Sequence, residues 1–133
     1  MTIQLTIIGT GRIGTSIGLA LAEETDQLTR VGHDREPAFA NKGKEMGAFD
    51  KTHINLHAAV KDADIVIFAI PVDEIYETMG HIADDLKPEA VVIDTSAVKS
   101  SATAWAKELL PESVDFLTLA LTLNLLALGC REK

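Results

Sequence analysis

Residues 7–18 read IIGTGRIGTSIG and place glycines at Gly9, Gly11 and Gly14. The β-branched run Ile3–Ile8 precedes the first glycine and predicts a strand, while apolar residues at helical spacing follow the last one. A G-x-G-x-x-G turn between a strand and a helix is typical of dinucleotide-binding domains. There Gly9 allows the tight turn, Gly11 lets the backbone approach a pyrophosphate, and Gly14 lets the helix pack closely.

Thr10, Arg12 and Ile13 complete the turn. We expect these turn residues to form part of the cofactor-binding site, because the helix N-terminus presents free N–H groups and a partial positive charge to the phosphates. Arg12 could reach a phosphate or lie in solvent. A purely structural strand-to-helix bend is the alternative interpretation of the whole turn.

Asp34 follows Gly14 by 20 residues, at the end of a second short strand predicted at 29–33. A carboxylate there accepts hydrogen bonds from the ribose hydroxyls and repels a 2′-phosphate, which favours NAD over NADP. The next residue, Arg35, keeps NADP open, because it could pair with a 2′-phosphate or stack on adenine. The sequence therefore predicts NAD, with NADP as the alternative.

Beyond this point strand-like and helix-like segments alternate along the chain. Strands are expected at 29–33, 65–70, 90–93 and 114–119, with an ambiguous edge segment at 49–55, and helices at 13–24, 36–46, 56–61, 72–86 and 100–110. Such alternation predicts βαβ units and an α/β fold with a doubly wound parallel sheet, the Rossmann dinucleotide-binding domain. Ala69, Ile70 and Pro71 end the fourth strand, where the backbone is expected to line the cofactor near its nicotinamide.

Composition narrows the class of protein. The chain has 133 residues, a formal net charge of −8 and one cysteine. The negative charge argues against nucleic acid or an anionic membrane as a partner. No secretory leader or membrane-spanning run is visible, so we expect a cytoplasmic protein. His53 and His57 have the i, i+4 spacing of a metal pair but lack a third ligand, so no metal site is predicted.

Three stretches together resemble the N-terminal domain of prephenate and arogenate dehydrogenases, within a group that includes 6-phosphogluconate and β-hydroxyacid dehydrogenases. They are IIGTGRIGTSIGLAL, AAVKDADIVIFAIPVDEI and VVIDTSAVKSSATAWAKELLP. The resemblance covers about residues 3–116. It implies NAD(P)-dependent oxidative decarboxylation of a small carboxylate, prephenate or arogenate, in tyrosine synthesis. In that family a histidine after the last strand and a serine in a D-x-x-S-x-K turn act on the substrate.

The sequence departs from that family pattern in two places. Aligned on Asp94 and Lys99, the position of the family serine is Ala97, and Ser96 is one residue away, as in β-hydroxyacid dehydrogenases. Ser96 and Lys99 are therefore weak catalytic candidates. No histidine follows His81, and the family's helical substrate domain is missing from this sequence. We expect a truncated enzyme, a fragment or a subunit that needs another chain, inactive alone.

Two further expectations concern the end of the chain and its function. Leucines alternate from 117 to 125, so we divide the chain into a domain at 1–116 and an apolar tail at 117–133, through which a homodimer would form. The alternative for the tail is a helix on the same domain. The alternatives for function are a non-catalytic dinucleotide sensor, a β-hydroxyacid dehydrogenase-type domain and, less favoured by the glycine spacing, an S-adenosylmethionine binder.

Overall fold

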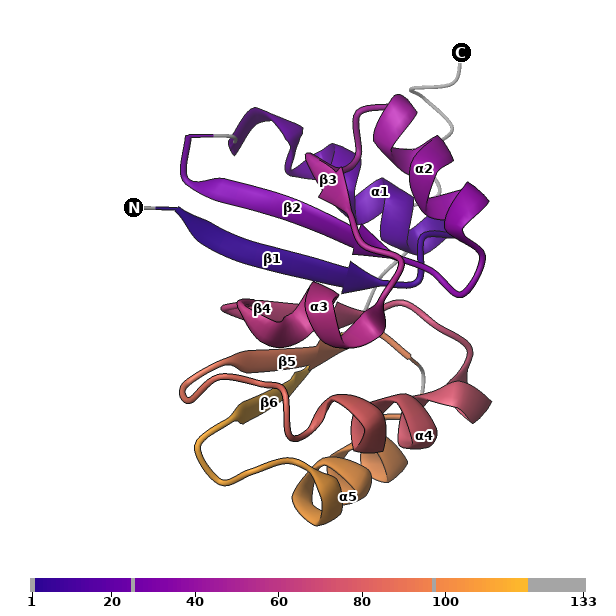
Figure 1. The fold of residues 1–133 in the computed structure, drawn as a ribbon. Helices are drawn as coiled ribbons and strands as arrows, with labels where there is room; N and C mark the ends of the chain where they lie inside the picture. The colour runs from indigo at the N-terminus through magenta and orange to yellow at the C-terminus, as the bar shows by residue number, and fades with distance from the viewer. Residues whose placement is uncertain (1, 25, 97, 120–133) are drawn as a thin grey trace.

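The computed structural model describes residues 2–24, 26–96 and 98–119 of the chain (Figure 1). The strands are β1 (Ile3–Ile8), β2 (Leu28–His33), β3 (Lys51–Thr52), β4 (Ile65–Phe68), β5 (Val91–Asp94) and β6 (Asp115–Thr118). The helices are α1 (Arg12–Ala20), the short 3-10 helix η1 (Ala22–Glu24), α2 (Pro37–Glu45), α3 (Leu56–Lys61), α4 (Val72–Ile82) and α5 (Lys99–Leu109).

The strands form one sheet in the order β3-β2-β1-β4-β5-β6. Every neighbouring pair is parallel, and the register sets Ile7 opposite Gly32 on one side and Ile67 on the other. This is the doubly wound parallel sheet that the sequence predicts. The chain order reverses between β1 and β4, so the loops after β1, β2 and β4 meet at the carboxyl edge of the sheet.

Two hydrophobic clusters cover the sheet, one on each face, and alternate residues of β1 enter them. Leu5 and Ile7 join Phe49 and the half-buried Ile17 of α1 in one cluster. Ile8 belongs to the other cluster, to which α3, α4 and α5 contribute and which includes Phe68, Ile75, Met79 and Ile82. Strands buried on both faces explain the continuous apolar run IVIF of β4.

The predicted helix over 13–24 is interrupted: α1 ends at Ala20 and η1 follows it. The carbonyl of Gly18 accepts from Leu21 N at 3.2 Å and from Arg30 Nη1 at 2.8 Å. The bond from Leu21 N to Gly18 O is an i to i−3 hydrogen bond of the 3-10 type, which tightens the last turn of a helix. A long-range contact from β2 therefore accompanies the end of α1, which the local pattern could not indicate.

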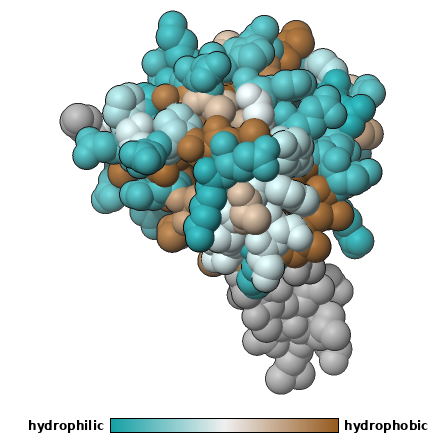
Figure 2. Space-filling model, turned by 90° about the horizontal axis from the view of Figure 1, so that it is seen from below, coloured by the Kyte–Doolittle hydropathy of each residue, from teal (hydrophilic) through white to brown (hydrophobic). Residues whose placement is uncertain are grey.

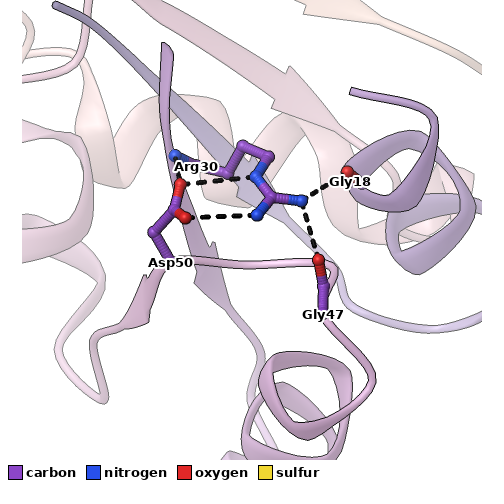
Figure 3. Close-up of polar contacts among 4 residues, drawn as sticks. All are labelled: Gly18, Arg30, Gly47 and Asp50. Carbon is purple, nitrogen blue, oxygen red and sulfur yellow. Dashed lines mark hydrogen bonds and ion pairs between the residues drawn. The ribbon is translucent and has the colours of Figure 1, made fainter. Parts of the chain in front are cut away.

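Arg30 is buried, and its guanidinium makes four polar contacts (Figure 3). Its guanidinium donates to Gly18 O and Gly47 O at 2.8 Å, and to the two carboxylate oxygens of Asp50 at 3.1 and 3.3 Å. The backbone N–H of Arg30 also donates to Asp50, at 2.8 Å. The side chain thus joins the end of α1 to the loop between α2 and β3.

The remaining element ends differ from the sequence pattern by a few residues. The ambiguous edge segment contains the two-residue strand β3, and α4 ends at Ile82 where the pattern extended it to residue 86. Hydrophilic side chains cover much of the face seen in Figure 2, with separate apolar patches between them. Within the part of the chain that the structure describes, no helix is long and apolar enough to cross a membrane.

Candidate functional site

The glycine turn connects β1 to α1 at the carboxyl edge of the sheet, and each of its glycines meets a different environment. Gly9 has φ of +99°, and a Cβ there would lie 2.4 Å from Ala69 O. A Cβ on Gly14 would lie 1.8 Å from Gly9 O. A Cβ on Gly11 would meet no atom within 4 Å. Gly9 and Gly14 are therefore required by packing, whereas Gly11 leaves open space beside the backbone.

That open space lies at the N-terminus of α1, for which Gly11 is the N-cap. Thr15 N donates to Gly11 O at 3.0 Å, the first bond of the helix. Among the described residues, the preceding amides of Arg12, Ile13 and Gly14 have no acceptor. Free amides and the helix dipole favour an anion at this position, so the turn fits a pyrophosphate.

Asp34 lies directly after β2, beside the glycine turn. Its Oδ2 accepts from Thr10 N at 2.9 Å and from Thr10 Oγ1 at 3.1 Å, and its Oδ1 accepts from Glu36 N at 2.9 Å. A carboxylate offers about four acceptor positions, so lone pairs remain for a ligand hydroxyl. The side chain therefore stabilises the turn and can still accept from a ribose.

A cavity of about 410 Å³ lies between the three loops. The glycine turn contributes Gly9 and Gly11, the loop after β2 contributes Asp34 and Arg35, and residues 69–71 after β4 form the opposite wall. Seven predicted cofactor-binding positions thus line one cavity, which has the size of a small-molecule site.

Arg35 and Glu74 form an ion pair across this cavity. Arg35 Nη1 lies 2.7 Å from Glu74 Oε1, and both residues line the cavity. The hydrogen bond from the guanidinium to Glu74 raises the pKa of Arg35 above its ordinary value, with the charge of Glu74 adding to the effect. Arg35 is exposed, yet its charge is already compensated by a carboxylate.

The other predicted binding residues lie elsewhere in the turn. Thr10 and Arg12 line a second hollow of about 430 Å³ between α1 and α2, which shares Gly11 with the first cavity. Ile13 is 49% exposed on α1 and lines neither cavity. Gly14 is buried against Gly9. Of these residues, Ile13 and Gly14 can reach a phosphate only through their backbone amides.

Comparison with known proteins adds to this geometry. The family described as prephenate dehydrogenase, nucleotide-binding domain, matches residues 17–118.

The chain belongs to this family.

Curated relatives carry the same name or a related one. The prephenate dehydrogenase of Lactococcus lactis subsp. cremoris is 32% identical over 107 residues, which are 80% of this chain and 30% of that protein. The cyclohexadienyl dehydrogenase of Zymomonas mobilis subsp. mobilis is 26% identical over 111 residues, 84% of this chain and 38% of that protein. The chain thus spans about a third of the length of these relatives.

Solved structures of the prephenate dehydrogenase group have the same fold. The arogenate dehydrogenase of Synechocystis matches with a TM-score of 0.73 at 24% identity, over 80% of this chain and 37% of that one. The prephenate dehydrogenase of A. aeolicus, solved with hydroxyphenyl propionate and NAD+, matches with a TM-score of 0.75 at 20% identity. The match covers 86% of this chain and 40% of that one. The family match begins at residue 17, after the glycine turn.

The two weak catalytic candidates of this prephenate dehydrogenase domain lie after β5. Ser96 Oγ donates to the buried carboxylate of Asp94 at 2.6 Å and accepts from Val98 N at 3.4 Å. These contacts close the turn that leads into α5. Lys99 is exposed at the start of α5, and it forms no ion pair among the described residues. Neither residue lines either cavity.

Several cavity-lining residues were not predicted as site residues. They are Ile8, His33, Glu36, Phe39, Leu56, Glu74 and Thr78. Glu74 had no distinctive signal, because an acidic residue in the first turn of a helix is normally explained by the helix dipole. His33 and Glu36 flank the predicted Asp34 and Arg35, so they could have been included by position alone. Within the described ranges no group of three or more histidine, cysteine, aspartate or glutamate residues could hold a metal ion.

Proposed function

We propose that this domain binds NAD+ as the nucleotide-binding part of an NAD(P)-dependent dehydrogenase that acts on prephenate or arogenate. One observation carries the proposal: the open glycine turn, the Asp34 carboxylate and residues 69–71 line a single cavity at the sheet's switch point. Family membership supports nucleotide binding, and the names of the relatives support the substrate class.

Each wall of the cavity has a chemical task in this proposal. The free amides at the start of α1 hold the pyrophosphate, and the open space beside Gly11 lets it approach the backbone. Asp34 accepts from the ribose hydroxyls, and residues 69–71 place the nicotinamide half along the end of β4. Bound NAD+ supplies a hydride acceptor, and the reaction also needs a group that takes the substrate's proton, for which no residue is proposed.

A non-catalytic dinucleotide-binding role is the second candidate function. It is favoured by Ser96, whose hydroxyl is committed to Asp94. In that role the cofactor would alter stability or association, with no turnover by these residues alone. The feature that separates the two functions is hydride transfer, which requires a donor positioned against the nicotinamide.

Calorimetric titration of the purified chain with NAD+, NADP+ and S-adenosylmethionine tests the binding proposal. We expect NAD+ to bind most tightly, because Asp34 disfavours a 2′-phosphate and no such group is present in NAD+. Absence of dinucleotide binding would overturn the proposal, and tighter S-adenosylmethionine binding would replace it with a different ligand class. Assays of NADH formation with prephenate and arogenate then separate the enzyme from the sensor.

We also propose a cytoplasmic homodimer whose subunits meet near β6. Strand β6 is an edge of the sheet that pairs with β5, and Leu117 and Leu119 are 55% and 45% exposed. An edge strand with exposed apolar residues is prone to pair with another chain. Strand β6 spans the proposed division at residue 116, and the rest of the apolar tail, 120–133, lies outside the described residues.

A further inference from the structure

Arg35 and Glu74 approach each other from two different walls of the cavity. Arg35 belongs to the loop between β2 and α2, and Glu74 to the first turn of α4. Their 2.7 Å contact therefore joins the wall beside Asp34 to the wall formed after β4. The side chain of Arg35 is 76% exposed and that of Glu74 is 28% exposed, so the acid is the more enclosed partner.

The charges around the cavity are unequal. Asp34, Glu36 and Glu74 contribute three carboxylates, whereas Arg35 contributes the only lysine or arginine charge among the described residues that line it. Glu77, one turn further along α4, adds to the negative potential that raises the pKa of Arg35. A ligand that brings an additional phosphate into this cavity meets one guanidinium, which is already paired.

We propose that Glu74 is a specificity-determining residue, which excludes NADP by engaging the guanidinium of Arg35 that would otherwise bind the 2′-phosphate. This inference rests on the proposed dinucleotide site. An arginine binds phosphate through planar, charge-assisted hydrogen bonds, and the same donors bind a carboxylate. A 2′-phosphate must therefore displace Glu74, and the displaced carboxylate would remain beside it as a like charge.

Discrimination is then shared between two carboxylates with different actions. Asp34 acts on the ribose directly, since its remaining lone pairs suit hydroxyl donors and its charge repels a phosphate. Glu74 acts through Arg35 and so determines whether the cavity contains a free cation. Removing the charge of Glu74 leaves Asp34 in place, and the two contributions can be measured separately.

The experiment compares Glu74→Gln with a matched control, Asp73→Asn, by calorimetry with NAD+ and NADP+. Both substitutions remove one negative charge from the first turn of α4, but Asp73 does not line the cavity or pair with Arg35. We expect Glu74→Gln to lower the ratio of the NADP+ to the NAD+ dissociation constant about two- to fivefold, the effect of one exposed ion pair. Asp73→Asn should leave the wild-type ratio.

A double variant tests the route through Arg35. Adding Arg35→Gln to Glu74→Gln should abolish the gain in relative NADP+ affinity, because the 2′-phosphate then has no guanidinium to bind. The inference is overturned if Glu74→Gln leaves the ratio unchanged, if Asp73→Asn lowers it equally, or if the gain survives in the double variant. A wild-type chain that binds neither dinucleotide would instead refute the proposed function, and this inference with it. Circular dichroism of every variant verifies folding.

Discussion

Asp34 accepts two hydrogen bonds from Thr10, from the backbone N–H at 2.9 Å and from the hydroxyl at 3.1 Å. The carboxylate proposed to contact the ribose therefore also fixes the turn proposed to contact the pyrophosphate. Loss of this side chain should affect both the stability of the turn and the affinity for the cofactor.

Substitutions at Asp34 can separate these two effects. Asp34→Ala removes the acceptors of Thr10, and we expect it to lower the free energy of unfolding by about 1–3 kcal/mol. Asp34→Asn retains an amide oxygen for Thr10 N, so it should cost less stability while still weakening NAD+ relative to NADP+. Urea unfolding and calorimetry measure the two quantities. Equal stability of Asp34→Ala and wild type would show that the tie to Thr10 contributes nothing.

Gly11 and Gly14 should respond oppositely to alanine. A Cβ at Gly14 would overlap Gly9 O, so Gly14→Ala should move α1 and destabilise the fold by about 1–3 kcal/mol or more. Gly11→Ala meets open space and should change stability by less than about 1 kcal/mol, but its methyl group would occupy the expected phosphate position. Thermal unfolding and NAD+ titration test the pair. Unimpaired NAD+ binding by Gly11→Ala would contradict the proposal that the pyrophosphate lies against this turn.

Arg30 is expected to be important for stability and not for ligand contact. Arg30→Met removes the guanidinium that donates to Gly18 O, to Gly47 O and to the carboxylate of Asp50, and should cost roughly 2–4 kcal/mol. Arg30→Lys keeps the charge but not the planar guanidinium. Its unfolding midpoint in urea should therefore fall between those of the wild type and Arg30→Met. A wild-type midpoint for Arg30→Met would contradict the proposed role.

Acid should destabilise the domain through two aspartates. Hydrogen bonding to Arg30 lowers the pKa of Asp50, and hydrogen bonding to Lys87 lowers the pKa of Asp64. A carboxyl group whose pKa is lower in the folded state stabilises the fold at neutral pH, and this contribution disappears as the pH falls through the folded pKa. The free energy of unfolding should therefore decline below about pH 5. Asp50→Asn and Asp64→Asn should each flatten that decline, and an unchanged slope in both would contradict it.

If the proposed homodimer forms, the apparent molecular mass in solution should depend on protein concentration. Sedimentation or light scattering at micromolar concentration should report two chains, and Leu117→Lys, which places a charge on the exposed face of β6, should shift the mass towards one. Thr103→Lys on α5 adds the same charge outside strand β6 as a control. A monomeric wild-type chain would exclude the dimer.

Local sequence pattern was sufficient for the central strands β1, β4 and β5, which are short apolar runs separated by segments long enough for helices. It left the polar two-residue edge strand β3 ambiguous. The spacing of Gly9, Gly11 and Asp34 in the sequence also indicated that these residues lie together, and they line one cavity, whereas their role in binding stays a prediction. Local pattern failed where a distant residue decides the outcome. The end of α1 coincides with a contact from Arg30, and the state of Arg35 depends on Glu74, which is 39 positions away. No local periodicity contains those contacts.

The close approach of Gly9 to the Ala69 carbonyl has a consequence for the thermodynamics of binding. The glycine turn is braced against the end of β4 on one side and against Asp34 on the other. A binding loop that is already fixed loses little conformational entropy when its ligand arrives. Affinity in this domain should therefore depend on preorganisation, and substitutions that never touch the nucleotide should weaken it by releasing the turn.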